Sequence, residues 1–196
     1  MIIKKYFCIF NKIQLEFKWR SIYKKLNGIN LLFLDVDGVL TDGGLWIDQH
    51  GNTTKRFDVK DGLGLKLLQN NGIQIVLVSG GFSGATEKRA KQLGIKYYFV
   101  EVKDKFQVVK DFQKKYGFLI ADTAYIGDDI NDSVVRPIVN LLFTPSDASI
   151  YLQKKADIIL QSKGGNGAIR ELSERFLLAK NSLSKFTKNG WVQRND

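Results

Sequence analysis

The chain has 196 residues, a length that suits one compact domain with a single hydrophobic core. Hydrophobic residues make up 44% and charged residues 26% of the chain, which is ordinary for a globular protein and excludes global disorder. A single cysteine excludes an intrachain disulfide and a secreted disulfide scaffold, so a reducing, cytoplasmic location is expected. The longest apolar runs are strand-sized, and no segment is therefore expected to span a membrane.

The net charge of +10 allows two interpretations. It could indicate affinity for nucleic acid or a membrane surface, or a basic surface that concentrates anionic small molecules. No nucleic-acid motif accompanies the charge, so we expect no nucleic-acid partner. A solvated basic face is the simplest explanation.

Much of the excess charge lies in residues 1–28, which are predicted to form a basic helical extension. Apolar residues recur there with a rough helical spacing at Ile13, Phe17, Ile22 and Leu26. A basic amphipathic helix can lie on a membrane. Packing on its own domain or on a neighbouring subunit is the favoured interpretation. The rest divides into one α/β domain at 29–185 and a tail at 186–196.

From residue 31 onward, short apolar runs alternate with segments of helical spacing. The predicted strands are 31–34, 73–78, 97–100, 124–126, 140–143 and 156–160. The predicted helices are 61–71, 83–93, 104–116, 129–138, 147–154 and 166–184. This alternation predicts a three-layer, Rossmann-like α/β fold, with a central parallel sheet and helices on both faces.

One segment interrupts the alternation directly after the first strand. Residues 45–47 and 53–57 read as a β-hairpin with Gly51 in its turn, and this hairpin could act as a flap. The only histidine, His50, lies beside the turn and is expected on the surface.

Polar residues follow four successive strands, at the edge of a parallel sheet where ligands bind. They are Asp35 and Asp37 after the first strand, Ser79 and Gly80 after the second, Lys105 after the third, and Asp128, Asp129 and Asp132 after the fourth. Carboxylates supply the hard oxygen ligands that Mg²⁺ prefers. Hydroxyl, amide and ammonium groups bind phosphate, while one carboxylate can attack phosphorus and another can transfer the proton. Each motif alone is weak, since Asp128-Asp129 could simply cap a helix. Together and in order they predict phosphoryl transfer.

These four segments resemble the four motifs of the haloacid dehalogenase (HAD) superfamily, and the resemblance covers residues 31 to about 175. It implies that Asp35 is the nucleophile and Asp37 the general acid and base. It also implies that Mg²⁺ is held by the Asp35 carboxylate, the Asp37 backbone carbonyl and Asp128. An acid at position 37 resembles the phosphatases of the superfamily, whereas its ATPases have threonine there.

The same resemblance assigns the remaining motif residues. Ser79, Gly80 and Lys105 would bind the phosphoryl group, and Asp129 and Asp132 would support the metal and the lysine from behind.

The spacing of the motifs leaves no room for a cap domain, because 43 residues separate Asp35 from Ser79 and 25 separate Ser79 from Lys105. The chain resembles the capless subclass typified by 3-deoxy-D-manno-octulosonate 8-phosphate phosphatase. The similar stretches are 35–43, 57–64, 89–95, 125–129 and 164–171. The resemblance implies a cytoplasmic homotetramer whose hairpins meet. It also implies a sugar-acid phosphate substrate, foremost 3-deoxy-D-manno-octulosonate 8-phosphate, and a step of lipopolysaccharide biosynthesis.

Three further residues are weaker candidates for contact with the substrate. Asp61 and Gly62 begin a helix beside the hairpin, and Asp61 could equally be the N-cap of that helix. The run 164–167 could be a flexible connection, but a mobile lid is favoured, with Arg170 near a carboxylate.

Two departures from the pattern leave alternatives open. Many relatives have arginine where this chain has Gly81, and 131–135 lacks the bulky aromatic residue common in the octulosonate enzymes. A phosphatase of nine-carbon ulosonate or acylneuraminate 9-phosphates, a broad small-molecule phosphatase and a non-catalytic HAD-fold binding module remain alternatives.

Overall fold

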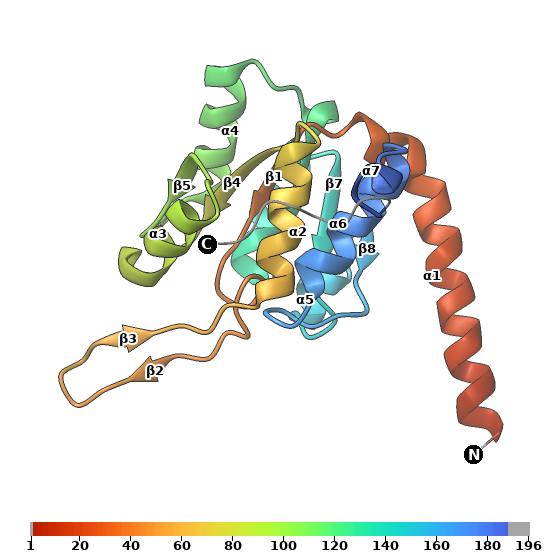
Figure 1. Ribbon diagram of the computed structural model, residues 1–196, viewed down its shortest axis with the longest axis horizontal. Coiled ribbons are helices and arrows are strands. Elements are labelled where there is room, and N and C mark those ends of the chain that lie inside the picture. Colours follow the sequence, from red (N-terminus) through yellow and green to blue (C-terminus); the bar gives the residue numbers. More distant parts are fainter. Residues whose placement is uncertain (1, 188–196) are drawn as a thin grey trace.

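The computed structural model describes residues 2–187, which form a six-stranded sheet with flanking helices (Figure 1). The strands lie in the order β5-β4-β1-β6-β7-β8, and every pairing is parallel. Their bounds are β1 (Leu31–Leu34), β4 (Gln74–Val78), β5 (Tyr97–Phe99), β6 (Thr123–Ile126), β7 (Leu141–Thr144) and β8 (Ile158–Ile159). The predicted parallel α/β fold is confirmed.

Central strand β1 shows why the sheet is covered on both faces. Leu32 and Leu34 point into one apolar cluster and Leu31 and Phe33 into the other, and all four are buried. The first cluster is covered by α1 (Ile2–Gly28), α2 (Val59–Asn70), α3 (Ser83–Gln92) and α6 (Ala168–Ala179). The second is covered by α4 (Lys105–Tyr116), the 3₁₀ helix η2 (Ile130–Ile138) and α5 (Ile150–Gln153). A continuous apolar run is typical of such a doubly buried strand.

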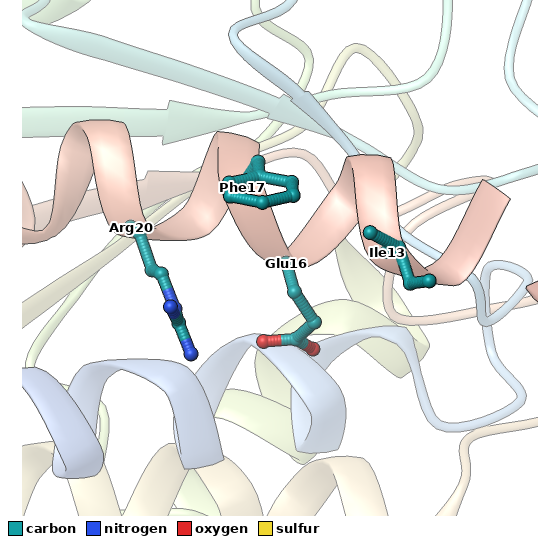
Figure 2. Close-up of a pocket in the computed structure, with 4 residues that line it drawn as sticks. All are labelled: Ile13, Glu16, Phe17 and Arg20. Carbon is teal, nitrogen blue, oxygen red and sulfur yellow. The ribbon is translucent and has the colours of Figure 1, made fainter. Parts of the chain in front are cut away.

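Helix α1 lies within the predicted helical extension at 1–28, and its second half packs on its own domain. Trp19 and Leu26 belong to the main core. Glu16 accepts a hydrogen bond of 2.9 Å from Arg175 of α6, and in Figure 2 both Glu16 and Arg20 point toward that helix. Together with Ile13 and Phe17 they line a hollow of about 260 Å³. The favoured interpretation of this helix is thus supported, although the division at residue 28 stays a prediction.

Across residues 2–187, no helix combines the length and apolar character needed to cross a membrane.

Three predicted helices differ in extent from the observed ones. The predicted helix at 129–138 is the 3₁₀ helix η2, which contains Pro137 and so lacks one backbone donor. The predicted helix at 166–184 is interrupted, because Asn181 has a left-handed backbone (φ 51°) between α6 and the short helix α7 (Leu183–Thr187). The predicted helix at 147–154 shortens to α5. Most of the predicted tail, residues 188–196, lies outside the described residues.

The predicted hairpin is present as β2 (Trp46–Ile47) and β3 (Thr53–Thr54), paired antiparallel and extending away from the sheet (Figure 1). Its turn is held by the Asp48 carboxylate, which accepts hydrogen bonds from the backbone N–H groups of His50 and Asn52. Every residue from 42 to 54 is exposed, His50 included. The hairpin is therefore a projecting arm rather than part of the core.

Candidate active site

Carboxylates and one lysine gather where β1, β6 and the start of α4 meet. The Lys105 ammonium lies 3.1 Å from Asp35 Oδ1 and 2.7 Å from Asp132 Oδ1. The side chains of these residues are no more than 7% exposed. One oxygen each from Asp35, Asp128 and Asp132 lies within 4.8 Å of the others. The fold thus brings together residues that lie far apart in the sequence.

Asp132 holds the other residues of this cluster in place through hydrogen bonds. Its Oδ1 accepts hydrogen bonds from Lys105 Nζ at 2.7 Å and from the Tyr125 hydroxyl at 2.6 Å. Its Oδ2 accepts from the backbone N–H groups of Asp128 and Asp129 at 3.0 and 3.2 Å. With both oxygens so occupied, Asp132 is suited to hold Lys105 and the loop of Asp128 in place. Tyr125 was not among the predicted site residues, because a tyrosine in a buried strand looks like a packing residue.

The buried charges shift one another's protonation. Burial, and then the Asp132 charge, raises the pKa of Asp35 well above its usual range. The pKa of Asp128 rises to about 6, also through burial first and Asp132 second. Burial alone would lower the pKa of Lys105, but the Asp35 and Asp132 carboxylates outweigh it and raise that pKa. The cluster therefore holds more negative charge than Lys105 compensates.

This surplus of buried carboxylate oxygen fits a hard divalent cation such as Mg²⁺. Because Asp132 is taken up by four donors, the carboxylates of Asp35 and Asp128 are the better ligands. Gly38 allows Asp128 to approach the loop after β1, since a Cβ on Gly38 would lie 1.9 Å from Asp128 Oδ2. The positive φ of Gly38 (84°) is also one that a side chain disfavours.

A second group of polar residues surrounds the Asp37 carboxylate. The Lys55 ammonium lies 2.7 Å from Asp37 Oδ1 and 2.8 Å from Oδ2. The buried Ser79 hydroxyl donates to Asp37 Oδ2 at 3.3 Å and accepts from Gly81 N at 3.1 Å. The neighbouring Gly80 is exposed at the rim. Sequence analysis missed Lys55, because a lysine in a polar hairpin looks like any other exposed charged residue and belongs to no recognisable motif.

Beside Asp37 opens a cleft of about 690 Å³ between the hairpin and the segment that follows β4. Leu45, Ile47 and Lys55 line it on the hairpin side, and Gly81 and Phe82 line it opposite. Phe82 is 82% exposed, so one wall of the cleft presents an open apolar face. The predicted flap thus borders a cleft that reaches a predicted catalytic residue.

Asp61 is buried, and its carboxylate is bound to the backbone of another helix. Its carboxylate accepts from the backbone N–H groups of Gly167 at 3.2 Å and Arg170 at 2.9 Å, at the start of α6. The N-cap of α2 is Asp58 instead, so the N-cap interpretation of Asp61 was wrong. Burial raises the pKa of Asp61 from its usual value. Asp61 therefore links α2 to the start of α6.

Gly62 and Arg170 also have structural surroundings. A Cβ on Gly62 would lie 2.4 Å from Arg89 Nη2, so Gly62 permits close packing of α2 on α3. The Arg170 side chain pairs with Glu174 one turn along α6, at 2.8 Å. Neither residue has a contact with the carboxylate cluster among the described interactions, and a substrate role for them stays a prediction.

The structure also gives the surroundings of the run 164–167 and of Asp129. The run 164–167 is hydrogen-bonded to neighbouring segments. Gly165 N donates to Val39 O at 2.9 Å, and Arg56 donates to Gly165 O at 3.1 Å. These bonds give the run defined partners, and a mobile-lid role for it stays a prediction. The exposed Asp129 carboxylate accepts from Ile130 N at 2.7 Å and caps η2, instead of contacting Lys105.

Comparison with known proteins identifies the family. The model of the haloacid dehalogenase-like hydrolases matches residues 58–134. The 3-deoxy-D-manno-octulosonate 8-phosphate phosphatase of Haemophilus influenzae is 39% identical, over 87% of this chain and 95% of its own length. The enzyme of the same name from Escherichia coli K12 is 33% identical, over 84% of this chain and 88% of its own.

Solved structures agree with these relatives. A HAD superfamily hydrolase from Legionella pneumophila has a TM-score of 0.83 at 36% identity, covering 90% of this chain and all of its own. The octulosonate 8-phosphate phosphatase of Moraxella catarrhalis, solved with a magnesium ion, a phosphate ion and a KDO molecule, has a TM-score of 0.81 at 36% identity. That match covers 85% of this chain and 95% of the other. The chain therefore belongs to the haloacid dehalogenase-like hydrolases, in the group that includes the 3-deoxy-D-manno-octulosonate 8-phosphate phosphatases.

Proposed function

We propose that this protein is a Mg²⁺-dependent phosphatase of 3-deoxy-D-manno-octulosonate 8-phosphate. The observation that carries the proposal is the buried cluster of Asp35, Asp128, Asp132 and Lys105 at the carboxyl ends of the strands. Its residue types and order match those expected for phosphoryl transfer, and the family relatives support the same activity.

In the first half-reaction, an Asp35 oxygen attacks phosphorus and the bond from phosphorus to the ester oxygen breaks. Asp37 gives its proton to the departing sugar oxygen. In the second half-reaction, Asp37 takes a proton from water as that water attacks the phosphoryl-Asp35. The bond between phosphorus and Asp35 breaks, which releases phosphate and restores the Asp35 carboxylate.

Binding of the phosphoryl group is assigned to Ser79, Gly80 and Lys105. Ser79 supplies a hydroxyl, Gly80 an amide at the rim and Lys105 a positive charge beside Asp35. Mg²⁺ would be held by the carboxylates of Asp35 and Asp128 and the backbone carbonyl of Asp37. When bound, it would neutralise charge on the transferring phosphoryl group.

The sugar acid is proposed from two kinds of support. The curated relatives carry the name of that activity, and the Moraxella structure holds a KDO molecule. In this chain the cleft beside Asp37, of about 690 Å³, is large enough for a small sugar. We propose a cytoplasmic enzyme that works as a homotetramer. The exposed Leu45, Trp46 and Ile47 of the hairpin support the assembly.

Phosphate release from a panel of phosphate esters tests this function. The panel holds 3-deoxy-D-manno-octulosonate 8-phosphate, a nine-carbon ulosonate 9-phosphate and unrelated sugar phosphates, each with and without Mg²⁺. The octulosonate ester should have the highest kcat/KM, and Asp35→Asn should abolish turnover, while the exposed Asp111→Asn should not. Preference for a nine-carbon ester would correct the substrate, and equal rates on all esters would indicate a broad phosphatase. Absence of Mg²⁺-dependent turnover on every ester would overturn the proposal.

A further inference from the structure

Lys55 stands apart from the rest of the hairpin arm in its burial. All residues from 42 to 54 are exposed, whereas the Lys55 side chain is only 6% exposed. It directly follows β3 and reaches back from the hairpin to the loop after β1, where it meets Asp37. A lysine is almost never buried to this degree unless it is paired.

The pair is close, and it engages the whole carboxylate of Asp37. Lys55 Nζ lies 2.7 Å from Oδ1 and 2.8 Å from Oδ2. Oδ1 is buried and makes no hydrogen bond with the described residues, so the Lys55 ammonium is what compensates it. The other contact, from Ser79 Oγ to Oδ2 at 3.3 Å, is long for a hydroxyl donor.

Removing Lys55 would leave the Asp37 carboxylate without its main partner. The pair differs from a fully exposed one, because Asp37 Oδ1 is buried and would lose the charge that compensates it. The Asp37 side chain is 34% exposed and borders the cleft, so it has room to turn toward water. Gly81 adds to that room, since it places no side chain against Asp37 Oδ2.

We propose that Lys55 is a positioning residue for the reaction: it fixes the orientation of the Asp37 carboxylate, so that Asp37 can transfer a proton to or from the phosphoryl site. This inference rests on the proposed phosphatase function. It also makes the hairpin part of the active site, because the backbone position of β3 sets where the Lys55 ammonium lies.

The first experiment compares Lys55→Met with Lys60→Met, the same substitution at an exposed lysine five residues on. Turnover by the wild type is measured first, and its absence would overturn the proposed function rather than this inference. Lys55→Met should lower kcat about 100-fold, the usual cost of misplacing a catalytic group by about 1 Å. KM should change less than about threefold, because Lys55 acts through Asp37 and not on the bound substrate. Lys55→Arg should recover most of the lost kcat, and Lys60→Met should match the wild type.

The second experiment repeats Lys55→Met in an Asp37→Asn background. If Lys55 acts through Asp37, the double variant should be less than about threefold slower than Asp37→Asn alone. A full additional loss of about 100-fold would overturn the proposal, since Lys55 would then act independently of Asp37. A raised KM at unchanged kcat in the single variant would assign Lys55 to substrate binding instead, and an unchanged kcat with unchanged KM would remove it from the reaction. Thermal unfolding of each variant separates these results from loss of the fold.

Discussion

Asp132 is the residue on which the geometry of the site most depends, because two oxygens satisfy four donors there. Two of these donors are the buried Lys105 ammonium and the buried Tyr125 hydroxyl. Tyr125 in turn owes its raised pKa first to its burial and then to the nearby Asp132 charge, so the phenol stays a donor. The other two donors are backbone amides that shape the loop carrying Asp128.

Asp132→Asn should therefore destabilise the protein although it changes the side-chain volume little. An amide NH₂ would face donors on one side, and Lys105 would lose a charged partner, so we expect a loss of about 3 kcal/mol in the free energy of unfolding. Urea denaturation measures it, with the exposed Asp111→Asn as the matched control. A loss below about 1 kcal/mol would contradict this account of Asp132.

The raised pKa of Asp128 predicts how Mg²⁺ binding depends on pH. Its folded value of about 6 exceeds the ordinary value of 3.8, so the metal-free fold gains stability from Asp128 at low pH and loses it as pH rises between these values. Mg²⁺ binds the ionised carboxylate and offsets that loss. Saturating Mg²⁺ should thus raise the Tm clearly at pH about 7.5 and much less at pH about 5. An equal shift at both pH values, or a full shift in Asp128→Asn, would count against Asp128 as a ligand.

At the scale of elements, the sequence predicted the sheet better than the helices. Strands buried on both faces leave continuous apolar runs, which is why β1 and β4 were found within one residue of their ends. The break between α6 and α7 was missed, because apolar spacing continues through Leu183 while the left-handed Asn181 is set by local backbone geometry. Lys55 was missed for a different reason. Its partner Asp37 is 18 positions away, and only the fold of the hairpin brings the two together.

Asp61 contributes to the packing of elements, since it joins α2 to the first turn of α6. Asp61→Asn should lower the free energy of unfolding by roughly 1–3 kcal/mol, because one of its two backbone donors would then face an NH₂ group. KM for the sugar-acid phosphate should stay within about twofold of the wild type. Urea denaturation and steady-state kinetics check the two parts. A large rise in KM at unchanged stability would restore the substrate contact first considered for Asp61.

At the scale of the whole molecule, the hairpin has apolar surface that residues 2–187 of the same chain do not cover. Leu45, Trp46 and Ile47 are 55%, 72% and 68% exposed and follow one another in the sequence. Consecutive exposed apolar residues of this size mark an interaction surface. They support the proposed homotetramer with hairpins in contact.

Trp46→Glu should lower the assembly to a smaller species, because a charge would have to be buried between hairpins. Gln49→Glu, which adds the same charge at the exposed turn, should leave the assembly unchanged. Sedimentation equilibrium measures both. A wild-type protein that sediments as a monomer would rule out the tetramer, and a Trp46→Glu protein that keeps the wild-type mass would place the interface elsewhere.

In the proposed mechanism, Asp35 itself carries the phosphoryl group during turnover. Acid quenching of the Mg²⁺-loaded protein with 3-deoxy-D-manno-octulosonate 8-phosphate, followed by mass spectrometry of the peptides, tests it directly. We predict a phosphoryl group on Asp35 within the first turnover, and none in Asp35→Asn. A phosphoryl group on any other residue, or continued turnover by Asp35→Asn, would contradict the account.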